Sequence, residues 1–366
     1  MSLRGLRLVL VGPLPPPEGG MANQTRQLAE QLESEGAVVT LVRTNPPCRP
    51  SWVDRLRFFR AAVRLLPYVV RLWRATANAE VVHVMANSGW AWYLCATPAI
   101  LVACMRGVPS VVNYHGGEAQ WFLERSGRIV RAILGWASAL AVPSAFLQQV
   151  FRRSGVGSDV VPNIVDPERF FPAAELVSRP HIVVPRNLEP IYDVPTALRA
   201  FARIRAQLPA ARLTVAGSGP ERLALQRQAT NLGIADAVDF CGRLSREQMA
   251  ALYRSARVVL NPSRVDNMPI SVLEGMASGV PVVSTNVGGV PFIVRDDVNA
   301  LLVAPGDDAG MAAAALRVLE QPAVAERLRN AALKEVEQYT WPQVKHRWAS
   351  VYASVRTGAR VSIRPA

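Results

Sequence analysis

The stretch from Val258 to Gly279 constrains the fold more than any other part of the chain. It opens with the apolar run Val258-Val259-Leu260, which is typical of a buried strand. A polar loop follows, and from Ile270 onward apolar residues recur at helical spacing. A strand that leads through a loop into a helix is typical of doubly wound α/β sheets, which bind ligands at the carboxyl ends of their strands.

Two carboxylates belong to this stretch. Asp266 lies in the loop, and Glu274 lies one turn into the helix, close to its positive N-terminal end. Either residue alone would most simply be a solvated surface acid. Because the strand, loop and helix bring both carboxylates to one edge of a sheet, we interpret them together as part of a ligand site.

The residues from Asp266 onward resemble the nucleotide-sugar site of the retaining glycosyltransferases of family 4, which have the GT-B fold. That family carries a Glu, seven residues, then Glu-Ala or Glu-Gly, followed by a Pro-Val-Val strand and a Gly-Gly turn. The run here is DNMPISVLEGMASGVPVVSTNVGG, in which Asp replaces the first Glu. The resemblance implies that Glu274 binds the ribose hydroxyls, while Asp266 and the backbone amides of Asn267, Met268 and Pro269 hold the donor sugar.

Three glycine turns fit the same family, although each is a weak signal alone. Gly19-Gly20 follows the first expected strand and opens a helix, where backbone N–H groups can face an anion. The resemblance assigns this turn to the donor phosphates and the acceptor cleft. It also matches the Gly-x-Gly-Pro turn that starts at Gly217, and it places Arg243 where relatives pack the nucleotide base.

Two further side chains take their roles from the resemblance. Arg186 follows an expected strand and matches the arginine that holds the diphosphate, which a guanidinium can clamp in two directions. His115 follows another strand and precedes two glycines, and it matches a histidine beside the reaction centre. A lone histidine is otherwise more often structural. We therefore assign His115 and Asp266 to the catalytic positions.

One cation of the family pattern is missing. The family usually adds a lysine five or six residues beyond its arginine, but Ile191 and Tyr192 stand there in this chain. Arg264 and Arg243 are the candidates to replace it.

The 366 residues predict two domains of ordinary size. The resemblance implies an α/β protein of the GT-B fold, with two doubly wound Rossmann-like domains facing a central cleft. We expect an acceptor-binding domain over 1–172, with a C-terminal helix over 341–357 packing back on it. A nucleotide-sugar-binding domain is expected over 180–338. The apolar segment 90–106 predicts a buried helix.

The implied reaction moves a sugar from a nucleotide-diphosphate donor, such as a UDP- or GDP-sugar, to an acceptor hydroxyl with retention of configuration. No Asp-x-Asp motif occurs, so neither a metal nor another cofactor is expected. Two other functions stay open. A non-catalytic binding or scaffold protein of GT-B shape would fit the missing lysine and the Asp at 266. A nucleotide-sugar epimerase would share the donor site.

The net charge of +13 comes almost entirely from arginine and favours acidic partners. No zinc-finger or aromatic RNA-binding pattern occurs, so nucleic acid is not expected. Residues 52–75 have an amphipathic pattern, in which arginines share an arc of about 100° opposite a broad apolar face. We interpret them as a helix on an anionic membrane, the alternative being an ordinary surface helix with solvated arginines.

The remaining signals concern the compartment. Four cysteines have no metal-like spacing and fit reduced thiols, and no signal peptide is expected. Together with residues 52–75, they predict a cytoplasmic protein on the inner face of the plasma membrane. A membrane lipid-linked glycan in polysaccharide biosynthesis is then the favoured acceptor.

Overall fold

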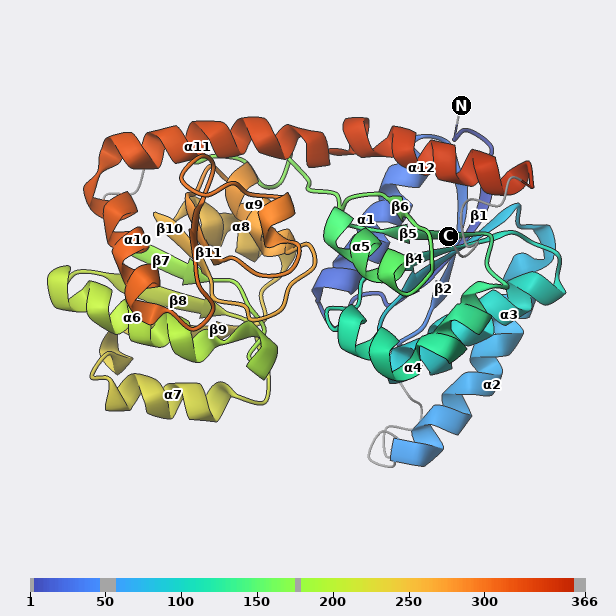
Figure 1. Cartoon of the computed structure of the whole chain (residues 1–366), viewed down its shortest axis with the longest axis horizontal. Coiled ribbons are helices and arrows are strands. Elements are labelled where there is room, and N and C mark those ends of the chain that lie inside the picture. The colour runs from blue at the N-terminus through green and yellow to red at the C-terminus, as the bar shows by residue number, and fades with distance from the viewer. Residues whose placement is uncertain (1–2, 47–56, 175–178, 359–366) are drawn as a thin grey trace. The chain divides into compact units, whose positions relative to one another are not determined.

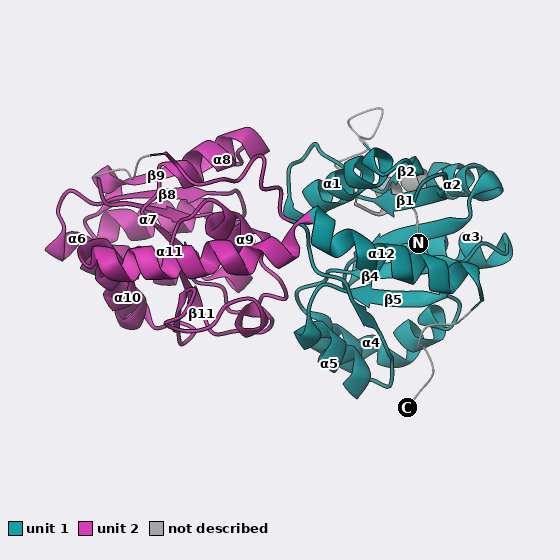
Figure 2. Ribbon diagram, turned by 90° about the horizontal axis from the view of Figure 1, so that it is seen from above, with its two compact units in different colours: residues 1–164, 341–366 teal, residues 165–340 magenta. Residues whose placement is uncertain are grey.

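The computed structural model describes residues 3–46, 57–174 and 179–358, and it gives no side-chain surroundings for 57–64. The chain divides into two compact units (Figure 2). The first contains Met1–Ile164 and Trp341–Ala366, and the second contains Val165–Thr340. Each unit is built on a 6-stranded sheet whose strand pairs are parallel. The predicted class, α/β with two doubly wound domains, is confirmed.

The sheet of the first unit has the order β2-β1-β3-β4-β5-β6. Its strands are β1 (Arg7–Gly12), β2 (Val38–Arg43), β3 (Val81–Ala86), β4 (Ser110–Tyr114), β5 (Ala139–Val142) and β6 (Asp159–Val160). Its helices are α1 (Gly20–Ser34), α2 (Arg57–Ala75), α3 (Thr97–Met105), α4 (Ala119–Leu134), α5 (Ala145–Arg153) and α12 (Trp341–Arg356).

Both faces of this sheet are covered, as the buried residues of β1 show. Val9 and Val11 belong to the apolar core shared with α2, α3, α4 and α5. Leu8 and Leu10 belong to the opposite core, which α1 and α12 complete. Successive residues of a strand point to opposite faces, so a strand covered on both sides is apolar throughout.

The C-terminal helix α12 is anchored to the middle of this sheet. Trp348 and Tyr352 pack against His83 of β3, whose Nδ1 lies 2.8 Å from the Tyr352 hydroxyl oxygen. Burial lowers the pKa of His83 to about 3, so the imidazole is neutral at pH 7. The last helix is thus an integral part of the first unit.

The sheet of the second unit has the order β12-β11-β10-β7-β8-β9. Its strands are β7 (His181–Val184), β8 (Arg212–Ala216), β9 (Val238–Gly242), β10 (Val258–Asn261), β11 (Val282–Thr285) and β12 (Leu301–Val303). Its helices are α6 (Val194–Gln207), α7 (Arg222–Asn231), α8 (Arg246–Arg254), α9 (Ile270–Ala277), α10 (Asp308–Glu320) and α11 (Pro322–Val336), all visible in Figure 1.

The strand order places a switch point between β7 and β10. The chain adds β8 and β9 on one side of β7 and then returns to add β10, β11 and β12 on the other side. The loops after β7 and β10 therefore turn in opposite directions at the carboxyl edge of the sheet. In doubly wound sheets this is the place where ligands bind.

The limit between the units differs from the expected domain limit. Residues 165–172, expected in the first domain, belong to the second unit. Val165 donates its backbone N–H to Tyr339 at 2.9 Å, and the Phe170 ring packs edge-on against Tyr253 with centroids 5.9 Å apart. Both residues are buried in the core around α8 and α9.

Two expectations for helices are refined by the structure. The segment expected as one buried helix over 90–106 begins with a π-helical turn at Trp92–Ala96, and Trp90 before it is 78% exposed. Of the expected helix over 52–75, residues 52–56 lie outside the described residues. None of the helices searched within the described chain is long and apolar enough to cross a membrane.

Candidate active site

The loops after β7 and β10 carry the charged pair at the centre of the second unit's site. Arg186 follows β7, and its Nε donates a hydrogen bond to Oδ1 of Asn261, the last residue of β10, at 2.8 Å. Its Nη2 donates to Oδ2 of Asp266 in the next loop at 2.5 Å. One guanidinium therefore ties together both sides of the switch point.

An aromatic ring contacts this arginine, and it belongs to Tyr192, one of the two positions where the family usually carries a lysine. The Arg186 Cζ atom lies 5.2 Å from the ring centroid of Tyr192. Arg186 is only 9% exposed, so this cation–π contact is largely shielded from water, which strengthens it. Tyr192 thus brings no second charge and instead helps to orient the existing one.

Asp266 is nearly buried beside Arg186. Burial raises the pKa of its carboxyl, and the Arg186 charge acts in the opposite direction. The backbone N–H of Asn267 and the Ser263 side chain also bond to this carboxyl and favour its charged form. The aspartate is fixed by three partners at the carboxyl edge of the sheet.

Glu274 lies in α9, the helix that follows this loop. The single O–H proton of the buried Tyr253 is shared between the Glu274 Oε2 at 3.2 Å and the Ser271 carbonyl oxygen at 3.1 Å. Burial raises the pKa of Glu274 to about 7, although the charges of Arg246 and Arg186 oppose this shift. The Glu274 carboxyl is therefore about half ionised near pH 7.

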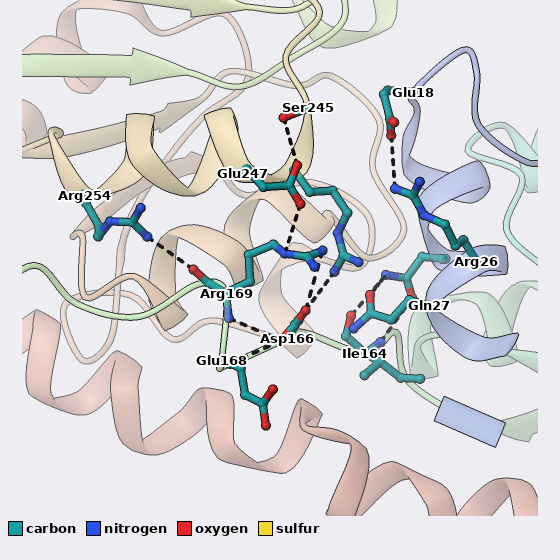
Figure 3. A network of polar contacts seen from close by, with 12 residues as sticks. Glu18, Arg26, Gln27, Ile164, Asp166, Glu168, Arg169, Ser245, Glu247 and Arg254 are labelled. Carbon is teal, nitrogen blue, oxygen red and sulfur yellow. Dashed lines mark hydrogen bonds and ion pairs between the residues drawn. The ribbon is translucent and has the colours of Figure 1, made fainter. Parts of the chain in front are cut away.

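A second ionic network, drawn in Figure 3, contains two arginines whose charges act on Glu274. Arg246, at the start of α8, donates from Nη2 to Asp166 Oδ2 at 3.4 Å. Arg169 approaches the same oxygen at 3.7 Å and the carboxylate of Glu247 at 3.6 Å. Both arginines lower the pKa of Glu274 through their charge. The sequence pattern did not reveal this network, because Asp166 and Arg246 lie 80 positions apart.

Two glycines allow the backbone to pass close to the charged pair. A Cβ atom on Gly217 would lie 2.0 Å from the Arg186 carbonyl oxygen, and one on Gly289 would lie 1.6 Å from the Asn267 carbonyl oxygen. No side chain fits at either distance. Gly217, predicted from its turn, therefore allows the backbone to pack directly against the Arg186 carbonyl group.

Replacing Gly217 with alanine should displace the Arg186 backbone. The added methyl group forces the Arg186 backbone aside, and overpacking of this kind costs about 1–3 kcal/mol. We expect a lower melting temperature and a smaller nucleotide-induced rise in it. Gly127→Ala in α4 is the matched control, because nothing lies within 4 Å of its Cβ position. Wild-type melting and a wild-type nucleotide response in Gly217→Ala would contradict this role.

The other predicted positions of the second unit differ in their surroundings. Asn267 and Met268 are buried, with 4% and 6% exposure. Pro269 precedes α9 and carries no N–H, so the amide predicted at this position cannot donate. Arg264 pairs through Nε with Asp193 at 2.9 Å, whereas Arg243 is exposed and has no ion pair within the described part of the chain.

The first unit holds the remaining predicted residues. Gly19 precedes α1 and Gly20 begins it, and a Cβ atom at either position would meet nothing within 4 Å. His115 follows β4 and donates its backbone N–H to Ala86 of β3 at 2.9 Å. Burial lowers the pKa of His115 to about 4, and its Nε2 has no hydrogen-bond partner among the described residues. The ring is neutral at pH 7, and Nε2 is a buried polar atom.

Two family models match the chain in succession. The model described as Glycosyltransferase Family 4 matches residues 18–169, and the model described as Glycosyl transferases group 1 matches residues 166–335. A glycogen synthase of Mycobacterium tuberculosis is 30% identical over 305 residues, which cover 79% of this chain and 71% of that protein. The MMP alpha-(1->4)-mannosyltransferase of Mycolicibacterium hassiacum is 31% identical, over 67% of this chain and 58% of that protein.

Solved structures agree in fold. The sucrose-phosphate synthase of Thermosynechococcus elongatus superposes with a TM-score of 0.80 and 21% identity, over 96% of this chain and all of that one. HepE of Anabaena, described as a complex with UDP-glucose, gives 0.73 and 17% identity, over 95% and 99%. The chain belongs to the family 4 glycosyltransferases of the GT-B fold. It is an enzyme of the hexosyltransferase type.

Proposed function

We propose that this enzyme transfers a sugar from a nucleotide-diphosphate donor to an acceptor hydroxyl, with retention of the anomeric configuration and without a metal ion. The observation that carries the proposal is the Arg186–Asp266 pair at the switch point, with Glu274 in the helix that follows. The relative HepE, described as a complex with UDP-glucose, supports a donor of this class.

The transition state of such a transfer has oxocarbenium character at the sugar and negative charge on the departing phosphate. Arg186 stabilises that negative charge. Within the described structure its Nε and one N–H of Nη2 donate to Asn261 and Asp266, so the N–H groups of Nη1 and the second N–H of Nη2 are left for the diphosphate. The N-terminal end of α9 adds partial positive charge in the same region. These groups replace a metal in neutralising the leaving group.

The remaining roles follow from placement and family resemblance. Glu274 accepts hydrogen bonds from the ribose hydroxyls, while Asp266 and the backbone of Asn267 and Met268 hold the donor sugar. In the first unit, the family resemblance assigns His115 to the donor sugar. The open Gly19-Gly20 turn at the start of α1 offers N–H groups to phosphate oxygens.

We further propose a lipid-linked glycan as acceptor and a peripheral position on the cytoplasmic face of the plasma membrane, as in polysaccharide biosynthesis. The described part of α2 supports this proposal. Arg71 and Arg74 are exposed beside Leu66, Val70 and Trp73, which are also exposed. Exposed tryptophan and arginine on one helix are typical of an interfacial helix.

A donor screen tests the proposal. We expect one nucleotide sugar from a panel of UDP-, GDP- and other sugars to be hydrolysed slowly and to raise the melting temperature. At a hundredfold excess over Kd, a ligand stabilises by about 2.7 kcal/mol. A protein that binds no nucleotide is a scaffold, and one that isomerises the sugar without acceptor is an epimerase. Either result would refute the transferase proposal.

A further inference from the structure

We propose that the outer face of α4 docks on an anionic phospholipid bilayer. This face consists of Trp121, Arg125, Arg128, Ile129, Ala132 and Trp136, the last lying just beyond the helix. The inference rests on the proposed function, because a lipid-linked acceptor would be met at such a surface. It adds α4 to the membrane surface proposed above for residues 52–75.

Helix α4 has apolar residues on two sides. Phe122, Leu123 and Val130 are buried in the core of the first unit. Farther round the helix, Trp121 is 57% exposed, Ile129 56% and Trp136 48%. At 100° per residue the outer face spans an arc of about 100°. A helix that only covers a core is polar on this side, so the exposed apolar residues indicate a binding surface.

Within α4 the charge on this face has one sign, whereas the exposed Glu118 at its N-cap lies in the same arc. Arg125 and Arg128 lie within the arc, and the Arg125 Cζ atom is 5.5 Å from the Trp121 ring centroid. The one acid of the helix, Glu124, lies outside the arc and accepts a hydrogen bond from Gln120 at 3.1 Å. Arginine beside exposed tryptophan is the composition that interfacial helices use to contact lipid phosphates and acyl chains.

The same composition continues on the neighbouring helices. Helix α3 contacts both α2 and α4, and the three lie side by side in Figure 1. Met105 at the end of α3 is 66% exposed, and Trp73 of α2 is 43% exposed. The Arg106 Cζ atom lies 4.8 Å from the Trp73 ring centroid, which repeats the arginine–tryptophan pair of α4. Exposed apolar and arginine side chains on several neighbouring helices form a broad surface, and a broad surface can contact many lipids of a bilayer at once.

Charge decides between a bilayer and a second copy of the chain. Two copies joined through this face would bring Arg125 and Arg128 against the same arginines, and like charges in a contact are destabilising. An anionic bilayer offers negative phosphates to the arginines and a headgroup boundary to the tryptophans, where indole rings accumulate.

Vesicle binding of the full chain tests this surface without donor or acceptor. We expect co-sedimentation with phosphatidylcholine vesicles containing phosphatidylglycerol, at least tenfold weaker binding to phosphatidylcholine alone, and a blue shift of tryptophan emission on binding. Trp121→Ser with Trp136→Ser should weaken anionic binding at least tenfold, and so should Arg125→Glu with Arg128→Glu. Added salt should weaken binding of the wild type.

The control is Leu223→Ala with Arg227→Glu, which changes an exposed leucine and an arginine on α7 of the second unit. It should bind vesicles like the wild type. The α4 variants must keep their far-UV circular dichroism and their nucleotide-induced rise in melting temperature, which separates docking from donor binding. Wild-type vesicle affinity in both α4 variants, or equal binding to neutral and anionic vesicles, would overturn the proposal. So would a wild-type dimer that the tryptophan variant converts to monomer, because that face would then be a protein interface.

Discussion

Arg186→Lys is expected to lower kcat/KM for sugar transfer by about 10²–10³-fold, the effect of removing one preorganised donor from a developing negative charge. Arg186 uses Nε for Asn261 and Nη2 for Asp266, and these two bonds aim the rest of the guanidinium. A lysine ammonium is a single point charge and cannot serve Asn261, Asp266 and a phosphate in one fixed geometry. Because Arg186→Lys keeps the positive charge, the loss of kcat/KM measures the contribution of the guanidinium's fixed donor geometry.

The conservative variant is chosen because Arg186→Ala would leave the Asp266 carboxylate buried without its main ion partner. Breaking a buried pair in this way costs about 3–5 kcal/mol and would confuse folding with catalysis. Arg203→Lys is the matched control. Arg203 is an exposed arginine of α6 that shares Asp308 with Arg199, so its replacement leaves that carboxylate paired. Initial rates with the donor found in the screen give the comparison, and unchanged kcat/KM in Arg186→Lys would remove this residue from the reaction.

Glu274→Gln is expected to abolish the nucleotide-induced rise in melting temperature while making the protein itself more stable at pH 8. The first effect follows from losing the carboxylate that accepts the ribose hydroxyls. The second follows from burial, which raises the pKa of Glu274 from 4.5 in the unfolded chain to about 7 in the folded one. Glu274→Ala should likewise remove nucleotide stabilisation and leave the fold intact.

The sign of the second effect comes from proton binding. Between pH 4.5 and about 7 the folded state holds a proton on Glu274 that the unfolded state has released, so folding stability falls as the pH rises through this window. The accumulated loss is roughly 3 kcal/mol above pH 7 and close to zero below pH 4.5. Glu274→Gln removes this dependence.

Urea unfolding at pH 5 and pH 8 measures this pH dependence of the folding stability, with Glu320→Gln as the control. Glu320 is an exposed acid at the end of α10 and should behave like the wild type. If the wild type and Glu274→Gln lose the same stability between the two pH values, the glutamate is not buried as described. If nucleotide stabilises Glu274→Gln as well as the wild type, its ribose role is refuted.

Local patterns predicted the elements of the site well. The run Val258-Val259-Leu260 is a buried strand, and α9 starts at Ile270 as the apolar spacing indicated. The helical recurrence defines that start, because it acts over a few neighbouring residues. The parallel pairing then carried Arg186, Asn261 and Asp266 to one edge, which a strand–loop–helix order predicts without any knowledge of contacts.

Contacts between distant side chains could not be predicted. Arg186 and Asp266 were both candidates, but their hydrogen bond depends on how two loops 80 positions apart fold over the sheet. Tyr253 and Arg246 beside Glu274 were missed altogether, because a tyrosine or an arginine in a polar helix carries no signal of its partner. The π-helical turn at Trp92–Ala96 was missed for a different reason. A continuously apolar segment has no periodicity from which a change of helix type could be read.

The position of α12 has a consequence for synthesis of the chain. The first unit needs Trp348 and Tyr352 to cover His83 and the apolar face of its sheet, yet these residues are translated after the whole of the second unit. On the ribosome the second unit can finish folding before α12 has been made, although α12 belongs to the first unit, as its colour in Figure 2 shows. Stop codons or truncations just before Trp341 should therefore damage the half of the enzyme that was made earliest, and a chaperone that shields exposed β1 and β3 would act there.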